Sequence, residues 1–224
     1  TALFGSDVYF KWDFNSINQN NVSFTNIIQN INQDNTFQVF VFREKTDLSY
    51  IIDSYLEGID SNNQDVNIIN EFNIINNWDV SEVTDMSSLF NQYIAFNQSI
   101  NQWIVNQVTD MSYMFNKASS FNSTIFTIPT ENVVSNQSHM FDGATLFNQD
   151  INQWDVSIVT DMSYMFNQAI GFNQNIVSWN VGNIINMSYM FNEANQFNNN
   201  LNEWNQYFNQ ASSKVTNMDY MFSN

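Results

Sequence analysis

The chain has 224 residues, and its 22 acidic against 5 basic side chains give a formal net charge of −17. A surface of this sign repels the phosphates of nucleic acids and anionic lipids, so we expect no nucleic-acid partner. The absence of cysteine excludes disulfides and thiol catalysis, and because no apolar run reaches roughly 18 residues we expect no membrane span.

Residues 1–70 contain no repeat and predict an N-terminal cap or a small non-repeat α+β domain. Two stretches, Asp7 to Phe14 and Thr36 to Phe42, alternate or run apolar and predict strands. Thr46 to Glu57 has the pattern of an amphipathic helix, and Gly58 marks its end. Because an array of stacked repeats exposes an apolar face at its ends, we expect this region to cover the first repeat.

Residues 71–224 repeat a motif about every 25 residues, which predicts a stacked array of about six repeats. A typical unit runs from Phe147 to Gly171 and reads FNQDINQWDVSIVTDMSYMFNQAIG. One unit of this length cannot bury its own apolar side, so equivalent residues are expected to form continuous ribs inside a coil. The units open at Phe72, Phe96, Phe121, Phe147, Phe172 and Phe197.

Each unit is expected to contain two short elements. The I-x-x-W segment predicts a strand, and the apolar spacing of V-T-D-M-S-Y-M-F predicts a short helical turn. The predicted fold is an α/β repeat, a right-handed leucine-rich-repeat-like solenoid with one parallel sheet and an N-terminal capping region. The apolar column that opens the helical turn reads Val83, Val108, Val134, Val159, Ile185 and Val215.

The repeated motif also carries a resemblance to a known family. The sequence W-D-V-S-x-V-T-D-M-S-x-M-F, followed by x-x-A and F-N-Q, resembles the repeat of BspA-like leucine-rich-repeat surface proteins, which include many mycoplasma-type surface lipoproteins. The third unit departs from the motif, because Ile128 and Pro129 stand where the others have tryptophan and its follower. The resemblance implies a secreted or surface-anchored protein that functions in adhesion.

The candidate binding site lies between the Ile and Trp columns, where side chains are expected to point outward from the strand face. Most of these residues are polar, uncharged and varied, which suits hydrogen-bonded recognition of a protein or a glycan; the alternative is that they only solvate the sheet. Phe126 and Val177 share these positions. The candidate binding residues are Asn101, Gln102, Thr127, Asn152, Gln153, Ser178, Asn202 and Glu203.

Residues that could carry chemistry are few, and we expect no enzyme activity and no cofactor. The single histidine, His139, stands in a column of tyrosines and reads as a substituted tyrosine. Asp85, Asp110 and Asp161 are weak calcium candidates, but asparagine replaces them in other units, which favours backbone capping. The N-x-S/T sequons are glycan acceptors if the source is a eukaryote, although a composition this rich in Asn, Ser and Thr also produces about this many by chance; they begin at Asn21, Asn97, Asn122, Asn136 and Asn186.

Two functions remain open on this basis. The first is a non-enzymatic extracellular or cell-surface recognition protein that binds a protein or glycan. The rival is an architectural subunit of an extracellular filament, coat or matrix, assembled through the ends of the solenoid. We expect the last coil to be uncapped, so that further chain or another copy would cover an apolar surface there. That surface is predicted to include Trp204, Val215, Met218, Met221 and Phe222.

Overall fold

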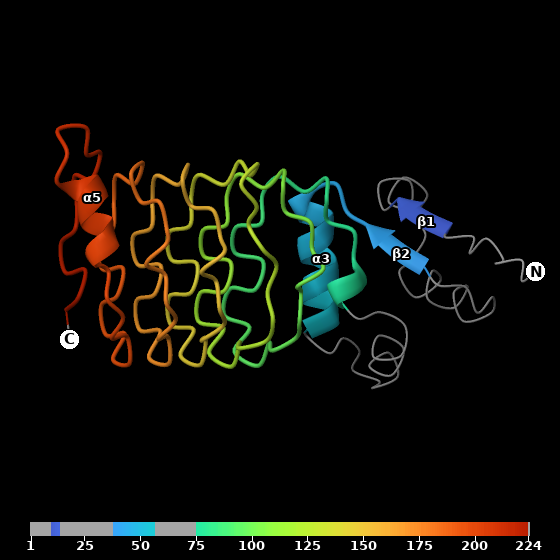
Figure 1. The fold of residues 1–224 in the computed structure, drawn as a ribbon. Helices are drawn as coiled ribbons and strands as arrows, with labels where there is room; N and C mark the ends of the chain where they lie inside the picture. Colours follow the sequence, from blue (N-terminus) through green and yellow to red (C-terminus); the bar gives the residue numbers. More distant parts are fainter. Residues whose placement is uncertain (1–9, 14–37, 57–74, 224) are drawn as a thin grey trace, which may run out of the picture.

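The structure is a computed structural model that describes residues 10–13, 38–56 and 75–223 (Figure 1). Strands β1 (Phe10–Asp13) and β2 (Gln38–Val41) pair in parallel, with Phe10 opposite Gln38 and Asp13 opposite Val41. Helix α3 spans Lys45–Leu56. Both predicted strands and the predicted helix are therefore confirmed over the described residues, while Asp7, Phe14, Thr36 and the expected stop at Gly58 lie outside them.

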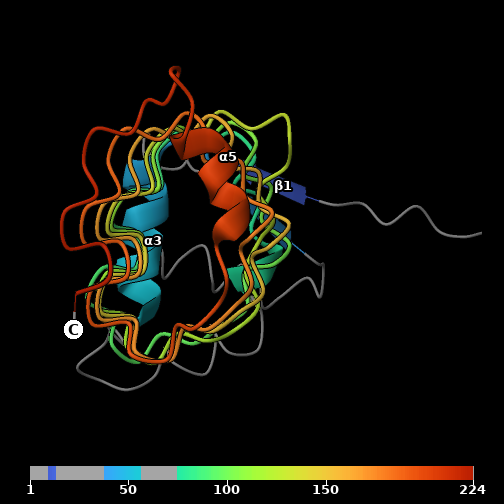
Figure 2. The same ribbon diagram turned by 60° about the vertical axis from the view of Figure 1, so that its left-hand side comes forward.

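From the 3-10 helix η1 (Ile75–Asn77) onward, the chain runs in successive coils that lie one above the other (Figures 1 and 2). Every second backbone N–H of one wall donates to a carbonyl of the next coil, as from Tyr113 to Ser138 (3.0 Å) and from Phe115 to Met140 (2.8 Å). We call the D-M-S-Y-M-F-N segments that make these bonds the ladder wall. Its parallel bridges join, in order, Asp85, Asp110, Asn136, Asp161, Asn186 and Asn217.

The two elements predicted within each repeat were wrong. The I-x-x-W segment forms a turn, closed in the second unit by a bond from the Trp103 N–H to the Ile100 carbonyl (3.2 Å), and carries no strand. The ladder wall carries the coil-to-coil pairing instead of a helix. Its chain makes successive turns in which one residue, such as Tyr113 (φ 58°), lies in the left-handed region. Alternate N–H groups therefore point to the next coil. In a helix, the same groups would donate to carbonyls of their own segment.

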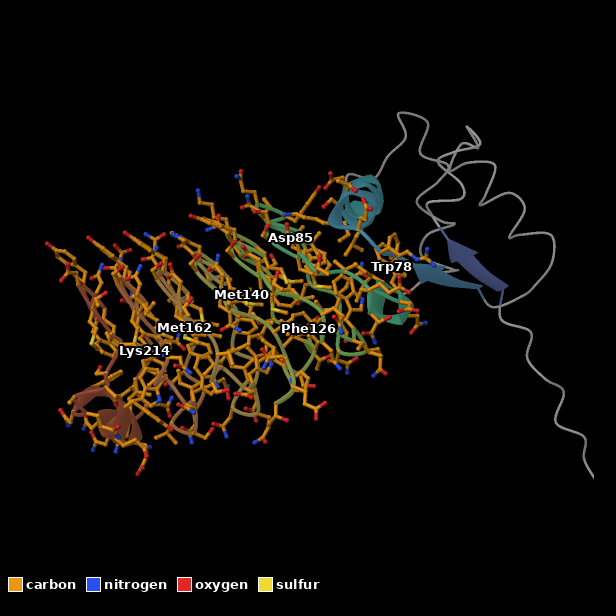
Figure 3. The ribbon with its side chains drawn as sticks, turned by 90° about the horizontal axis from the view of Figure 1, so that it is seen from above. Trp78, Asp85, Phe126, Met140, Met162 and Lys214 are labelled. Atoms are coloured by element: carbon orange, nitrogen blue, oxygen red, sulfur yellow. The ribbon has the colours of Figure 1, made fainter. Side chains whose placement is uncertain are left out.

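Buried aromatic ribs hold the coils together. Phe166 and Met165 are fully buried, as predicted, and the ring of Phe166 stacks on Phe141 and Phe191 with centroids 5.7 and 5.6 Å away. A second rib joins it inside the stack, with Phe172 3.9 Å from Phe166. Side chains fill the space between the walls in Figure 3, where buried Met140 and Met162 are labelled. Contact of like residues in neighbouring coils is the expected result of repeat stacking.

Two columns of the core differ from the prediction. Ile185 is 44% exposed and Ile184 fully buried, so the apolar column passes through Ile184. Phe126, expected on the surface, is also buried (Figure 3). The Trp154 indole N–H donates to the Phe126 carbonyl (3.0 Å), as the Trp179 indole does to the Ile151 carbonyl (3.1 Å), so Phe126 takes the isoleucine position. The third unit has one extra residue, and this shifts its register.

Helix α3 covers the first coil, as Figures 1 and 2 show. Leu48 and Ile52 of α3 are fully buried in the same core as the ribs. Polar bonds surround them: the Tyr93 hydroxyl donates to Asp53 (2.6 Å), and the Lys45 ammonium lies 3.3 Å from the Asp85 carboxylate and also contacts the Ser87 hydroxyl. In the described part of the N-terminal region, α3 therefore packs against the first coil.

The last coil is less open than predicted. The 3-10 helix η2 (Asn202–Trp204) leads into helix α5 (Asn205–Phe208), whose Phe208 ring meets Trp204 edge-on with centroids 6.4 Å apart. Trp204 and Met221 are buried and Val215 is half-buried. The prediction that these three residues lie on an exposed apolar surface is therefore wrong. Met218 and Phe222 remain 41% and 58% exposed, because α5 lies against the opposite wall (Figure 2).

Candidate functional site

The predicted binding residues lie on a row of turns, not on a strand face. We call the residues between the Ile and Trp columns the turn face. All of the candidates are exposed except Asn152, which is half-buried. Side-chain bonds join neighbouring coils along it, from Asn76 Nδ2 to Asn101 Oδ1 (2.9 Å) and from the Ser178 hydroxyl to Asn152 Oδ1 (2.6 Å). The structure therefore brings equivalent turn-face residues side by side.

A second amide ladder runs through the F-N-Q motif. The Asn173 N–H donates to Asn148 Oδ1 (2.9 Å), and Gln174 Nε2 donates to the Asn148 carbonyl (2.8 Å) and to its Oδ1 (3.0 Å). Asn122 and Asn198 continue the same pattern. No role was predicted for this motif, although its recurrence in consecutive units is the sequence signal for the ladder. Its role here is to tie coils together, since the amide oxygens satisfy backbone donors that lie outside the ladder wall.

The aspartate column acts on its own backbone. Asp110 Oδ1 accepts the Ser112 N–H (2.7 Å), and Asp161 Oδ1 accepts the Ser163 N–H (2.8 Å). Asparagines make the same bond, as in Asn136 to Ser138 (3.1 Å), which explains why the two residue types alternate in the column. Among the described residues, no group of three or more acidic, histidine or cysteine side chains is placed to hold a metal ion.

Asp85 differs from the rest of its column because a cation lies beside it. Burial opposes its ionisation, but the hydroxyl and backbone N–H of Ser87 and the nearby Lys45 outweigh burial, so the pKa of Asp85 is below its usual value. The carboxylate is thereby held in its charged form at the junction between α3 and the first coil. This weak calcium candidate is thus already paired with a protein cation.

An aromatic ladder runs along the outside of the ladder wall, and His139 takes a tyrosine position in it, as its column predicts. Its ring lies 4.3 Å from Tyr113 and 4.4 Å from Tyr164, nearly parallel to both, and its Nδ1 is 2.8 Å from Asp142 Oδ2. Burial, then the neighbouring Tyr164 and Tyr220 phenols and Asp219, raise the pKa of Tyr189. Because the rings cover one another, the ladder offers edges to a ligand instead of open faces.

One polar side chain lies within the core. Gln137 stands in a methionine column, is fully buried, and neither its Nε2 nor its Oε1 has a hydrogen-bond partner among the described residues. Its amide is two residues from His139, but it points into the stack and forms no surface site. Burying an amide without partners costs stability, so Gln137 is a local weakness of the third unit.

A cleft of about 260 Å³ opens on the turn face between the fifth and sixth coils. It contains two of the predicted binding residues, Asn202 and Glu203, with three asparagines that sequence reasoning missed. The residues around the cleft are Asn175, Val177, Asn199, Asn200, Asn202 and Glu203.

Comparison with protein families assigns the repeats. A family model described as "Mycoplasma protein of unknown function, DUF285" matches residues 59–152 and again residues 129–224. The chain belongs to this family. The two DUF285 matches together cover the repeat region and overlap within it, and residues 1–58 fall outside them. No curated protein and no solved structure matches the chain. In the described part of this DUF285 member, no helix is both long enough and apolar enough to cross a membrane.

Proposed function

We propose that the chain is a non-enzymatic recognition protein, located outside the cell or on its surface, that binds a protein or glycan through the turn face. Membership of the repeat family and the motif's resemblance to BspA-like surface proteins support this location and role. The acidic composition, with 22 acidic and 5 basic residues, favours ligands that are not anionic.

One observation carries the proposal: the turn face presents exposed polar side chains at fixed positions on a cross-linked stack. The backbone beneath them is held by bonds such as that from Gln102 N–H to Asn76 Oδ1 (2.9 Å). Side chains mounted on a rigid array lose little freedom when they bind a ligand, which favours recognition. Repeat arrays use extended surfaces of this kind for binding.

The test compares two triple variants of equal composition. The first, Gln102→Ala, Gln153→Ala and Glu203→Ala, removes side chains from the turn face. The control, Gln92→Ala, Gln168→Ala and Glu193→Ala, removes the same residue types at exposed positions on another corner. Labelled protein is applied to host cells and to extracellular matrix, and bound protein is measured. We expect the first variant to lose most binding and the control to retain it; equal binding by both contradicts the proposal.

We also propose that the stack is a right-handed leucine-rich-repeat-like solenoid. Five parallel bridges that join six successive coils, and the continuous phenylalanine ribs, support it. Right-handed connections between parallel segments are strongly favoured, because the twist of the chain packs back on itself in that sense. An experimentally determined structure with left-handed coils would contradict this assignment.

An architectural role is the second candidate, favoured by the exposed Met218 and Phe222 at the sixth coil. Apolar side chains at the edge of a repeat stack gain stability when another coil covers them, whether from further chain or another copy. Sedimentation velocity over a wide concentration range tests self-assembly. Assembly that Met218→Ser and Phe222→Ser abolish would support this role, and a monomer at all concentrations would remove it.

A further inference from the structure

The cleft between the fifth and sixth coils lies beside a turn residue that cannot bond across the gap through its side chain. At two other coil junctions an asparagine takes this position and bonds across: Asn76 donates to Asn101, and Asn152 accepts from Ser178. In the fifth coil this position is Val177, which has no polar side-chain atom, and no bond joins it to the sixth coil among the described residues. A cavity of about 260 Å³ lies between the turns at this junction.

The asparagines around the cleft are held in fixed orientations. Asn175 Oδ1 accepts the Val177 N–H (3.1 Å), and Asn200 Oδ1 accepts the Asn202 N–H (2.8 Å). Asn199 Nδ2 donates to both Asn173 oxygens (2.9 Å each). These bonds use one end of each amide and fix the direction of the other end. The remaining ends are two NH2 groups, from Asn175 and Asn200, and the Asn199 oxygen.

This set of groups suits hydroxyls. A hydroxyl both donates and accepts, and the cleft offers amide donors beside the Asn199 oxygen and the Glu203 carboxylate as acceptors. Val177 contributes an apolar patch for C–H groups, and the cavity is smaller than the ~300–1,000 Å³ of sites for drug-sized ligands. No cationic side chain lies among the lining residues, and the chain carries a net charge of −17, which disfavours anions.

We propose that this cleft binds one neutral sugar unit, a hexose or N-acetylhexosamine, of a glycan. The inference rests on the proposed function, because it names the ligand class for one part of the turn face. Asn175 and Asn200 donate to ring hydroxyls, Asn199 and Glu203 accept from them, and Val177 contacts an apolar edge of the sugar ring. A single shallow site of this kind binds weakly, and a polymeric glycan would gain affinity by engaging several protein copies.

The experiment uses the full chain and free monosaccharides. Glucose, galactose and N-acetylglucosamine are titrated by calorimetry or ligand-observed NMR at millimolar concentrations, with glucuronate as the anionic comparison. We expect at least one neutral sugar to bind, and glucuronate to bind about tenfold or more weakly than it. If no neutral sugar binds, or if glucuronate binds equally well, the proposal is overturned.

Val177→Asn is the decisive variant, because it introduces the residue that bridges the turns at two other junctions. It should close the cleft and weaken sugar binding about tenfold or more while leaving the midpoint of thermal unfolding unchanged or higher. The matched control, Val133→Asn, makes the same substitution at an exposed valine outside the cleft and the turn face and should bind sugar normally. Glu203→Gln keeps a hydrogen-bond acceptor but removes the negative charge. It should therefore reduce the difference in affinity between neutral sugars and glucuronate. Sugar binding that survives Val177→Asn overturns the proposal.

The outcomes separate this inference from the broader proposal. Binding to cells by a protein that binds no sugar leaves the recognition function in place and removes the glycan site. Sugar binding by a protein that does not attach to cells or matrix leaves the glycan site in place and removes the broader recognition function. If Val177→Asn reduces attachment to cells and enzymatic removal of their glycans does not, the occupant is a peptide and the sugar proposal is overturned.

Discussion

Individual residues in this stack depart from their columns for identifiable reasons. Gln137 replaces methionine in the core of the third unit, where its amide has no hydrogen-bond partner among the described residues. Asp85 alone among the column of aspartates and asparagines lies beside a lysine, Lys45. Each departure changes the stability of one coil, while the neighbouring coils keep the usual residue at the same position. The equivalent residues therefore provide internal controls.

Gln137→Met should stabilise the protein. The change removes a buried amide without partners and supplies the residue that fills the same position in the adjacent coils, so we expect a gain of about 1–3 kcal/mol in the free energy of unfolding. Chemical denaturation measures the change. The reverse substitution in the next coil, Met162→Gln, should cost a comparable amount, and equal stability of wild type and Gln137→Met would show that the amide is satisfied.

The contribution of Asp85 should depend on pH. Its pKa in the folded chain lies below the usual value of 3.8, so its charged form stabilises the fold at neutral pH. That stabilisation is present above the unfolded pKa and is lost as pH falls through the folded pKa, in the range below about pH 4. Asp85→Asn should therefore be less stable than wild type at pH 7, and the difference should shrink as pH falls below about 4. A difference that does not change with pH contradicts this account.

At the scale of elements, two kinds of hydrogen-bond ladder hold the coils together. The ladder wall uses backbone bonds between alternate residues, and the F-N-Q ladder uses asparagine side chains where the backbones of adjacent coils do not pair directly. The second kind requires asparagine at a fixed place in each unit, because only a short side chain with an oxygen reaches the N–H one coil away. Asn97, Asn122, Asn148 and Asn173 each fill that place.

Asn148→Ala should weaken the F-N-Q ladder. The Asn173 N–H would lose its acceptor and Gln174 one of two, so we expect a loss of about 1–2 kcal/mol in the free energy of unfolding. Asn148→Asp retains an oxygen at the same place and should cost less. Hydrogen exchange at the Asn173 amide provides a local readout, and a slow amide in the alanine variant would contradict the assigned bond.

At the scale of the whole molecule, the repeats form a stack whose two ends differ in how far a helix covers them. At the first coil α3 buries Leu48 and Ile52, and at the sixth α5 covers only part of the surface. Between them, the phenylalanine ribs run without interruption from Phe90 to Phe222. A change in one coil therefore reaches its neighbours through shared contacts, as expected of an array with nearest-neighbour interfaces.

Phe166→Ala should remove one ring from the middle of a rib. We expect a loss of about 3–5 kcal/mol in the free energy of unfolding, the usual cost of deleting a buried phenylalanine. Denaturant unfolding of the full chain measures it. The exposed Tyr220→Ala serves as a comparison outside the core and should cost far less.

Detaching α3 should expose the first coil. Leu48→Asp with Ile52→Asp places two charges against the core, so we expect the helix to separate and the protein to aggregate at lower concentration. Light scattering measures the onset of aggregation. The control, Thr46→Asp, adds a charge at an exposed position of the same helix and should behave as wild type.

The sequence by itself determined the repeat, its length, most of the buried ribs, a helix at Thr46 to Glu57 that the structure has at Lys45–Leu56, and most residues of the turn face. These were readable because stacking demands the same apolar residue at the same place in every coil. Tertiary structure alone decided that the D-M-S-Y-M-F-N segment, not I-x-x-W, forms the ladder wall, and that Ile184 and Phe126 face inward. Backbone bonds between coils join residues about 25 positions apart, so local spacing does not encode which segments pair. The cleft beside Val177 is lined by residues of two different coils, so it too appears only once the coils are stacked.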